Sequence, residues 1–213
     1  MTEIDWAVIK DAFAAPEITI DVYKRMPEEV SKLIEVVDGL LVRCESAEPT
    51  HQLIAHNFVN VLHEAMTALD REQGSCHRVV PDVDVLMAEV PRFHFRRPDV
   101  TVYRRIDKDR GRWRRKPYAS DCLLVLEIVS ADSVTVDIRD KLAEYAAAGF
   151  PHYWIVRMDR NDGPAISVER FELAAGGQYV TAGRTVRGLD FDAVNTTRPF
   201  PLKAGWEQLD EGF

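Results

Sequence analysis

The chain has 213 residues, of which 46% are hydrophobic and 29% are charged, and its formal net charge is −8. This length suits one well-buried globular domain or two small ones. No apolar run reaches the roughly eighteen residues of a transmembrane helix, and the acidic start at residues 1–6 is unlike a signal peptide. The scattered Cys44, Cys76 and Cys122 fit reduced thiols and lack the spacing of a zinc site, so we expect a cytoplasmic protein without a membrane segment.

The N-terminal region is predicted to hold peripheral helices followed by a hairpin. Apolar residues at helical spacing between Ile4 and Phe13 indicate a short amphipathic helix, and Pro27 begins another at its first turn. Residues 33–42 have the pattern of a β-hairpin, because Asp38-Gly39 supplies the positive φ of a tight turn.

The middle of the chain alternates helical and strand patterns. A helix capped by Thr50 carries an apolar stripe as far as Leu69, and residues 136–148 form a second helix that ends at Gly149. Strands are predicted at 78–86, 99–103, 122–129 and 152–156. A strand, a helix of about a dozen residues and another strand in succession indicate a right-handed crossover onto a parallel neighbour.

Two further strands, at 165–171 and 178–180, predict a C-terminal hairpin. The expected fold class is therefore α/β, with a core of helix, three strands, helix and strand and a hairpin added at each end. We divide the chain into peripheral helices (1–30), a core that includes the N-terminal hairpin (31–160) and a C-terminal β extension of the same domain (161–213).

Glu127 is the only polar residue in the run 122–129, which otherwise has the pattern of a central strand covered on both faces. An ionised carboxylate in such a strand costs several kcal/mol unless a cation or hydrogen-bond donors meet it. Asp99 at the start of an upstream strand, and Asp137 and Lys141 on the following helix, are candidates to share its site.

This combination predicts a metal-dependent phosphodiesterase. Mg²⁺ prefers oxygen ligands, and Asp99, Glu127 and the backbone carbonyl of Ile128 can supply them if the two strands pair. Lys141 shares a helix face with Asp137 and Tyr145 and is expected to orient the attacking water or to stabilise developing charge. The alternative explanation of Asp137 and Lys141 is an exposed ion pair worth about 0.3–0.5 kcal/mol.

A basic segment offsets the acidic charge that argues against a nucleic-acid enzyme. Residues 92–116 contain eleven Lys or Arg against three Asp. Two explanations stay open: a solvated, salt-bridged loop, or an arm that grips phosphates, with Trp113 stacking on a base. The candidate nucleic-acid-binding residues are Arg97, Arg112, Trp113, Arg114, Arg115 and Lys116.

An ordered set of short motifs resembles the bacterial Uma2 family of restriction endonucleases, which belongs to the PD-(D/E)XK nuclease superfamily. The motifs lie at residues 35–39, 97–99, 126–130 and 153–156, with His51, Ser133, Asp137, Lys141, Tyr145 and Gly149 between them. The resemblance covers roughly residues 26–156.

The resemblance implies a restriction-endonuclease-like core and a Mg²⁺- or Mn²⁺-dependent endonuclease that acts on DNA, with RNA or a branched nucleic acid as alternative substrates. Asp99 would be the metal-binding aspartate and Glu127 the acidic residue of the second motif. The superfamily's usual lysine is replaced by Val129, and Lys141 is expected to substitute for it. The rival hypothesis is a catalytically inactive nuclease-fold protein that binds nucleic acid or serves assembly. By analogy of fold, we also expect a homodimer.

Other acidic and histidine residues are weaker candidates. Asp82 is interpreted as a surface position and Asp84 as a weak candidate, because their strand comes one step too early relative to Glu127. His56 and His63 lack the spacing of a helical zinc site and are expected to be solvated. The remaining candidate accessory residues are Glu35, His51 and Glu64.

Overall fold

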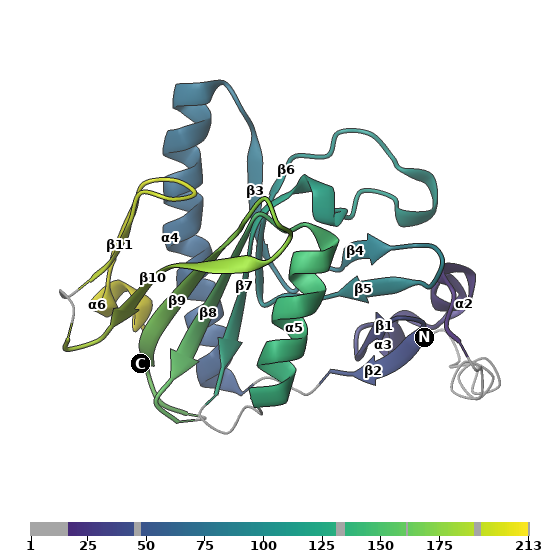
Figure 1. Ribbon diagram of the computed structural model, residues 1–213, viewed down its shortest axis with the longest axis horizontal. Helices are drawn as coiled ribbons and strands as arrows, with labels where there is room; N and C mark the ends of the chain where they lie inside the picture. The colour runs from purple at the N-terminus through teal and green to yellow at the C-terminus, as the bar shows by residue number, and fades with distance from the viewer. Residues whose placement is uncertain (1–16, 45–47, 131–134, 161, 190–192, 213) are drawn as a thin grey trace.

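The computed structural model of the protein describes residues 17–44, 48–130, 135–160, 162–189 and 193–212. Its strands form sheets of six, four and two strands (Figure 1). The predicted α/β class is confirmed, and so is the core order of helix, three strands, helix and strand. None of the helices in the described ranges is both long and apolar enough to span a membrane.

The six-stranded sheet holds the core. Its strands, from one edge to the other, are β10 (Tyr179–Val186), β9 (Ala165–Leu173), β8 (His152–Met158), β7 (Cys122–Val129), β6 (Val100–Arg104) and β3 (His77–Pro81). Among the described strands of this sheet, only β7 and β8 pair in parallel, and the helix α5 (Thr135–Ala148) connects them as predicted. The C-terminal hairpin of β9 and β10 extends this sheet rather than standing apart from it.

Each face of β7 meets a different helix, which explains its nearly continuous apolar sequence. Leu124, Leu126 and Ile128 pack in one core with the apolar stripe of α4 (Pro49–Gln73). Val125 and Val129 pack in a second core that includes Tyr145 of α5. The two helices therefore cover opposite faces of the sheet (Figure 1). Glu127 lies between Val125 and Val129 on the face that α5 covers.

A smaller sheet lies beside the α5 side of the molecule (Figure 1). Its order is β2 (Leu40–Arg43), β1 (Ile34–Val37), β5 (His94–Arg96) and β4 (Val85–Ala88), with the short helices α2 (Ile20–Arg25) and α3 (Glu28–Ser31) against it. The hairpin of β1 and β2 turns at Asp38 and Gly39, which adopt φ of 48° and 78°, as the sequence predicts. Two 3₁₀ turns, η1 (Gly111–Trp113) and η2 (Ala119–Asp121), precede β7.

The C-terminal segment packs against α4. The hairpin of β11 (Ala193–Thr196) and β12 (Leu202–Gly205) leads into α6 (Trp206–Leu209). Asn57 of α4 donates hydrogen bonds to the backbone carbonyls of Leu209 and Glu211 at 3.1 and 3.0 Å. This segment thus closes the core on the far side of the long helix.

Three local predictions need correction or lie outside the described ranges. The long helix begins at Pro49 after the N-cap residue Glu48, so Thr50 lies within its first turn instead of capping it. The single strand predicted at 78–86 is two strands in different sheets, β3 and β4, separated by Asp82 with φ 48°. The helix predicted between Ile4 and Phe13 lies outside the described residues.

Candidate active site

Asp99 and Glu127 face each other across neighbouring strands. The register of β6 and β7 pairs Val100 with Leu126, so one further step places Asp99 opposite Glu127. Residues at such positions have their Cβ atoms about 4.5–5.5 Å apart. The Asp99 carboxylate accepts a hydrogen bond of 2.6 Å from the backbone N–H of Ile128. That bond fixes Asp99 at the end of β6, beside the residue that follows Glu127.

Glu127 is buried, with 4% of its surface exposed, and both of its oxygens have partners. Lys141 Nζ lies 2.9 Å from Oε2, and the Tyr145 hydroxyl donates to Oε1 at 2.5 Å. Burial raises the pKa of Glu127 to about 7; the Lys141 charge opposes this rise, and the negative charge of Asp99 adds to it. The site therefore holds a carboxylate whose charge is only partly compensated by the protein.

The spacing of Lys141 and Tyr145 brings both side chains to the carboxylate of Glu127. They are four residues apart on α5 and so share one face of the helix. The Tyr145 ring is fully buried and makes edge contacts with Phe150 and Tyr153 at centroid distances of 5.1 and 5.0 Å. Burial, and then the Glu127 charge, raise the pKa of the Tyr145 phenol, which is therefore a neutral hydrogen-bond donor.

His51, in the first turn of α4, bridges two of the predicted metal ligands. Its Nε2 atom is 3.2 Å from Asp99 Oδ2 and 3.2 Å from the backbone oxygen of Ile128. Burial alone would lower the pKa of His51, but the hydrogen bond and charge of Asp99 outweigh it and raise the pKa. His51 therefore places a positive or proton-donating group between these oxygens.

Asp82 borders the site although its sequence position indicated an ordinary surface residue. The side chain is exposed, but its backbone N–H donates to the Asp99 carbonyl at 3.4 Å. Partial burial of its carboxyl group, together with the charge of Asp99, raises the pKa of Asp82. The pairing of Pro81 with Val100 accounts for this proximity. A sequence signal existed, because one Pro-Asp pair lies at the end of β3 and another directly precedes β6, and these two strand termini pair.

Glu35 is held in an ion-pair cluster beside the site. It accepts hydrogen bonds from Arg96 at 2.8 Å and from the Arg97 backbone at 2.6 Å. Arg96 also forms a two-pronged pair with Glu144 of α5, with both hydrogen bonds at 2.8 Å. Neither Arg96 nor Glu144 belongs to a motif that indicated a role for it from the sequence. Their cluster connects the small sheet to the helix that carries Lys141.

The predicted nucleic-acid-binding residues divide into buried and exposed members. Trp113 is 3% exposed and packs among Tyr23, Phe93 and Phe95, so the prediction that it stacks on a base is wrong. Arg97 and Lys116 both pair with the buried Asp84. Arg114 and Arg115 are exposed.

The other accessory candidates lie elsewhere or are not described. Glu64 is exposed on α4, thirteen positions beyond His51, which is about 20 Å along a helix. It is therefore not part of this site. The side chains of Asp137 and Arg112 lie outside the described part of the structure, as does Ser133.

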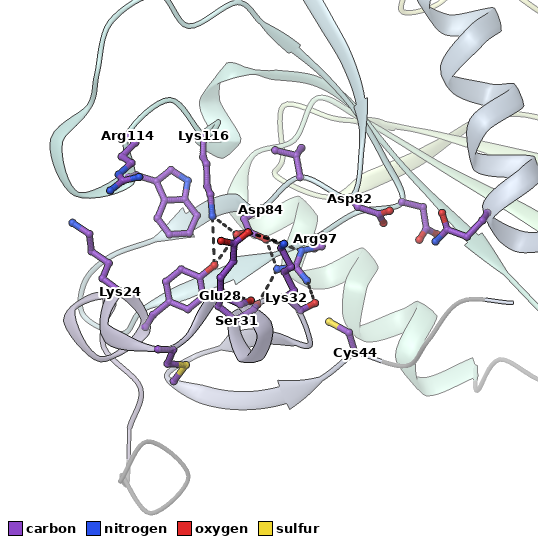
Figure 2. A pocket seen from close by; sticks show the side chains of 16 residues that line it. Lys24, Glu28, Ser31, Lys32, Cys44, Asp82, Asp84, Arg97, Arg114 and Lys116 are labelled. Carbon is purple, nitrogen blue, oxygen red and sulfur yellow. Dashed lines mark hydrogen bonds and ion pairs between the residues drawn. The ribbon is translucent and has the colours of Figure 1, made fainter. Parts of the chain in front are cut away.

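A pocket of about 870 Å³ opens beside Asp99. The lining at one end includes Asp82, Asp99 and Gln52, and other lining residues are Lys24, Arg114 and Lys116. In Figure 2, Lys24 and Arg114 lie on the side of the pocket opposite Asp82, with Asp84 and Arg97 between them. The pocket therefore meets the candidate site at Asp99 and has acidic and basic ends.

Comparisons with known proteins agree with this architecture. A crystal structure of "a putative nuclease belonging to DUF820" from Anabaena variabilis superposes with a TM-score of 0.61 at 17% identity, covering 91% of this chain and 97% of that chain. This likeness confirms the predicted nuclease-like fold. No curated protein matches the chain. The model of the Uma2 family, described as "Putative restriction endonuclease", matches residues 20–199, and the chain therefore belongs to the Uma2 family.

Proposed function

We propose that the protein is a Mg²⁺- or Mn²⁺-dependent endonuclease that hydrolyses phosphodiester bonds of DNA at Asp99, Glu127 and Lys141. Membership of the family and the nuclease-like fold support a nuclease function. The observation that carries the proposal is the pairing of β6 and β7, which sets Asp99 across from a buried Glu127 held by Lys141 and Tyr145.

The residues fit a hard divalent cation. Asp99, Glu127 and the Ile128 carbonyl offer only oxygen donors, and the raised pKa of Glu127 reflects burial together with the nearby charge of Asp99. In the described ranges, no three His, Cys, Asp or Glu side chains form a ready-made metal cage. Mg²⁺ suits such a site because it binds through one or two carboxylates and retains several waters. Bound there, it would polarise the phosphate and activate a water.

The side chains of the protein have distinct roles in this proposal. Tyr145 and Lys141 fix the two oxygens of Glu127, so the carboxylate is oriented before substrate arrives. Lys141 also supplies the positive charge that Val129 cannot, and it reaches the site from α5 instead of from β7. His51 holds Asp99 from the other helix and is a positioning residue.

The proposal is tested with Mn²⁺ calorimetry and plasmid nicking. We expect Asp99→Asn to abolish the binding heat and Glu127→Gln to lower the nicking rate at least a hundredfold, a magnitude typical of removing one catalytic group. Glu207→Gln, an exposed glutamate on α6, is the matched control and should leave both measurements unchanged. Equal nicking by the wild type and Glu127→Gln would refute the assignment.

The closed network around Glu127 also supports the rival function, a nucleic-acid-binding protein without turnover. Lys141 and Tyr145 occupy both Glu127 oxygens, and His51 lies against Asp99 and the Ile128 carbonyl. If this network does not open to a cation, the wild type will bind DNA but will give neither Mn²⁺ heat nor nicked product. That combination of results would favour the rival.

A further inference from the structure

The pocket beside Asp99 combines two groups of opposite charge. Asp82 and Asp99 lie at the end next to the candidate site, and each raises the negative potential around the other. Lys24 and Arg114 lie at the other end (Figure 2). A hollow with this arrangement suits a ligand that carries negative charge along its length and reaches a cation at its acidic end.

The positive charge at the basic end is not cancelled by the acids of the lining. Glu28 pairs with Lys32. Asp84 forms ion pairs with Arg97 and Lys116 and accepts a hydrogen bond from the Tyr23 hydroxyl. Within the described ranges, no carboxylate pairs with Lys24 or Arg114, and both side chains are exposed. These two cations are therefore available to contact phosphates.

The floor between the two ends is rigid. Asp84 is 5% exposed and accepts hydrogen bonds from Tyr23 at 2.7 Å and from Arg97 at 2.7 Å. Arg97 donates in turn to the backbone carbonyls of Ser31 and Lys32, so it joins β5 to α3. The Lys116 ammonium lies over the Trp113 ring, 5.1 Å from its centroid. Such a floor keeps the spacing between the acidic and basic ends fixed.

The reacting groups lie below the surface. The side chains of Asp99, Glu127 and Lys141 are 17%, 6% and 18% exposed. A DNA duplex is stiff over about 150 base pairs and presents its phosphates on a wide cylinder, whereas a single strand bends freely. A strand that bends freely can bring a phosphate into such a recess more easily than a stiff duplex can. A charged groove that follows the backbone is the usual way to bind a single strand.

We propose that this pocket binds a single-stranded segment of DNA, with one phosphate at the Asp99 end and another phosphate, further along the strand, at Lys24 and Arg114. The proposal rests on the proposed function, because the phosphate at Asp99 is the one that is cleaved. It adds Lys24 to the predicted contacts and assigns Arg114 a position within the pocket. Arg97 and Trp113 build the floor and make no direct contact with bases.

The binding test uses fluorescence anisotropy in Ca²⁺, a hard cation that takes oxygen ligands, with a labelled oligothymidine and a blunt hairpin duplex of equal phosphate number. The wild type should bind the single strand at least tenfold more tightly than the duplex. Lys24→Glu/Arg114→Glu should weaken single-strand binding at least tenfold and reduce the salt slope by about 1.4, the value for two lost phosphate contacts on a single strand.

The matched control is Arg71→Glu/Lys203→Glu, which makes the same charge change at exposed residues that do not line this pocket. It should change the affinity by less than twofold, which separates local contacts from the general effect of net charge. Equal loss in both double variants, or tighter binding of the duplex by the wild type, would overturn the proposal. Circular dichroism of each variant confirms that it is folded.

Cleavage of the same two oligonucleotides with Mn²⁺ separates this inference from the proposed function. If neither is cut, the nuclease assignment fails while the binding comparison still decides the pocket's role. If the duplex is cut faster than the single strand, the nuclease assignment stands and the pocket proposal fails. Preferential cutting of the single strand, lost in the Lys24→Glu/Arg114→Glu variant, supports both.

Discussion

Glu127 shows how one side chain connects stability with function. A carboxylate this deeply buried is costly unless it is paired, and here Lys141 and Tyr145 supply the pairing. The pair does not make the fold more stable than an apolar pair of the same size would, because both groups lose their hydration. The arrangement is therefore better explained by chemistry at the site than by packing.

Removing Lys141 should destabilise the fold, and removing the Glu127 charge as well should restore it. We expect Lys141→Met to lower the free energy of unfolding by about 3–5 kcal/mol, because a buried charge loses its partner. Glu127→Gln/Lys141→Met should recover most of that loss, since no unpaired charge remains. Urea unfolding measures both values. Arg139→Met, an exposed position on the same helix, is the control, and a Lys141→Met protein as stable as the wild type would contradict the argument.

Residues whose neighbours are set by strand pairing were the most predictable part of the site. The sequence suggested Asp99, Glu127 and Lys141 together, because a buried strand and a following helix fix their relative positions. Trp113 was misjudged because its basic neighbours indicated an exposed loop, whereas four aromatic rings meet there. Asp82 is exposed as predicted, but its place beside Asp99 follows from the break between β3 and β4 at φ 48° and was not predicted.

At the level of elements, the position of α5 decides whether Lys141 and Tyr145 reach Glu127. Glu144 of this helix forms the two-pronged pair with Arg96 of β5, and Arg96 also binds Glu35 of β1. This cluster joins the small sheet to α5 one turn beyond Lys141. The small sheet therefore contributes to the site indirectly, by fixing the helix that presents its lysine.

The stability contributed by this connection should depend on pH. Burial alone would raise the pKa of Glu144, but the His94 ring nitrogen 3.5 Å away and the charge and hydrogen bonds of Arg96 lower it. A depressed folded-state pKa gives stability that is complete above the unfolded value of about 4.3 and is lost as pH falls through the folded value. Glu144→Gln should therefore lower Tm by about 4–8 °C at pH 7, a loss of about 2 kcal/mol.

The Tm difference between the wild type and Glu144→Gln should narrow as pH falls below about 4.3. Thermal unfolding followed by circular dichroism across this pH range provides the measurement. Glu207→Gln, at an exposed position on α6, should show no such pH-dependent difference. A gap of constant size from pH 7 to pH 3.5 would show that Glu144 acts through packing instead of charge.

Long periodic segments were predictable, and short non-local strands were not. The run at 122–129 and the helix at 136–148 appear within one residue of their predicted bounds, because burial dictates their pattern. The three-residue strand β5 was missed, since His94 and Arg96 resemble exposed positions until Asp38, Glu35 and Glu144 are placed around them. The predicted strand 78–86 was split because its two halves pair with different partners, β6 and β5.

At the scale of the whole molecule, the positive charges of residues 92–116 do not act as one exposed basic arm, because several of them form ion pairs with nearby carboxylates. Many cations of the window 92–116 are engaged with carboxylates: Arg96 with Glu35 and Glu144, Arg97 and Lys116 with Asp84, and Arg110 with Asp121. The salt-bridged explanation of this window therefore holds for these residues, while Arg114 and Arg115 stay exposed. Arg97 and Lys116 thus help to build the wall of the pocket. Most of the other described cations of the window, among them Arg92, Arg104 and Lys108, are exposed.

The C-terminal segment should be indispensable for folding, as expected if residues 161–213 belong to the same domain as the core. Val194, Phe200, Leu202 and Leu209 are buried in the core that also contains α4. Each such side chain contributes about 1.5–3 kcal/mol, so their loss removes roughly 6–12 kcal/mol, comparable to the total stability of a typical domain. A protein ending at Leu189 should therefore fail to fold cooperatively.

A single substitution tests the same point without shortening the chain. Val194→Asp should abolish the cooperative urea transition, because it buries a charge in this core, whereas Asn195→Asp at the adjacent exposed position should leave the transition within about 0.5 kcal/mol of the wild type. If the protein ending at Leu189 unfolds as cooperatively as the full chain, the C-terminal segment is a separate unit. In that case the apolar side chains of α4 are buried sufficiently by the six-stranded sheet alone, and packing against β11, β12 and α6 is not required for folding.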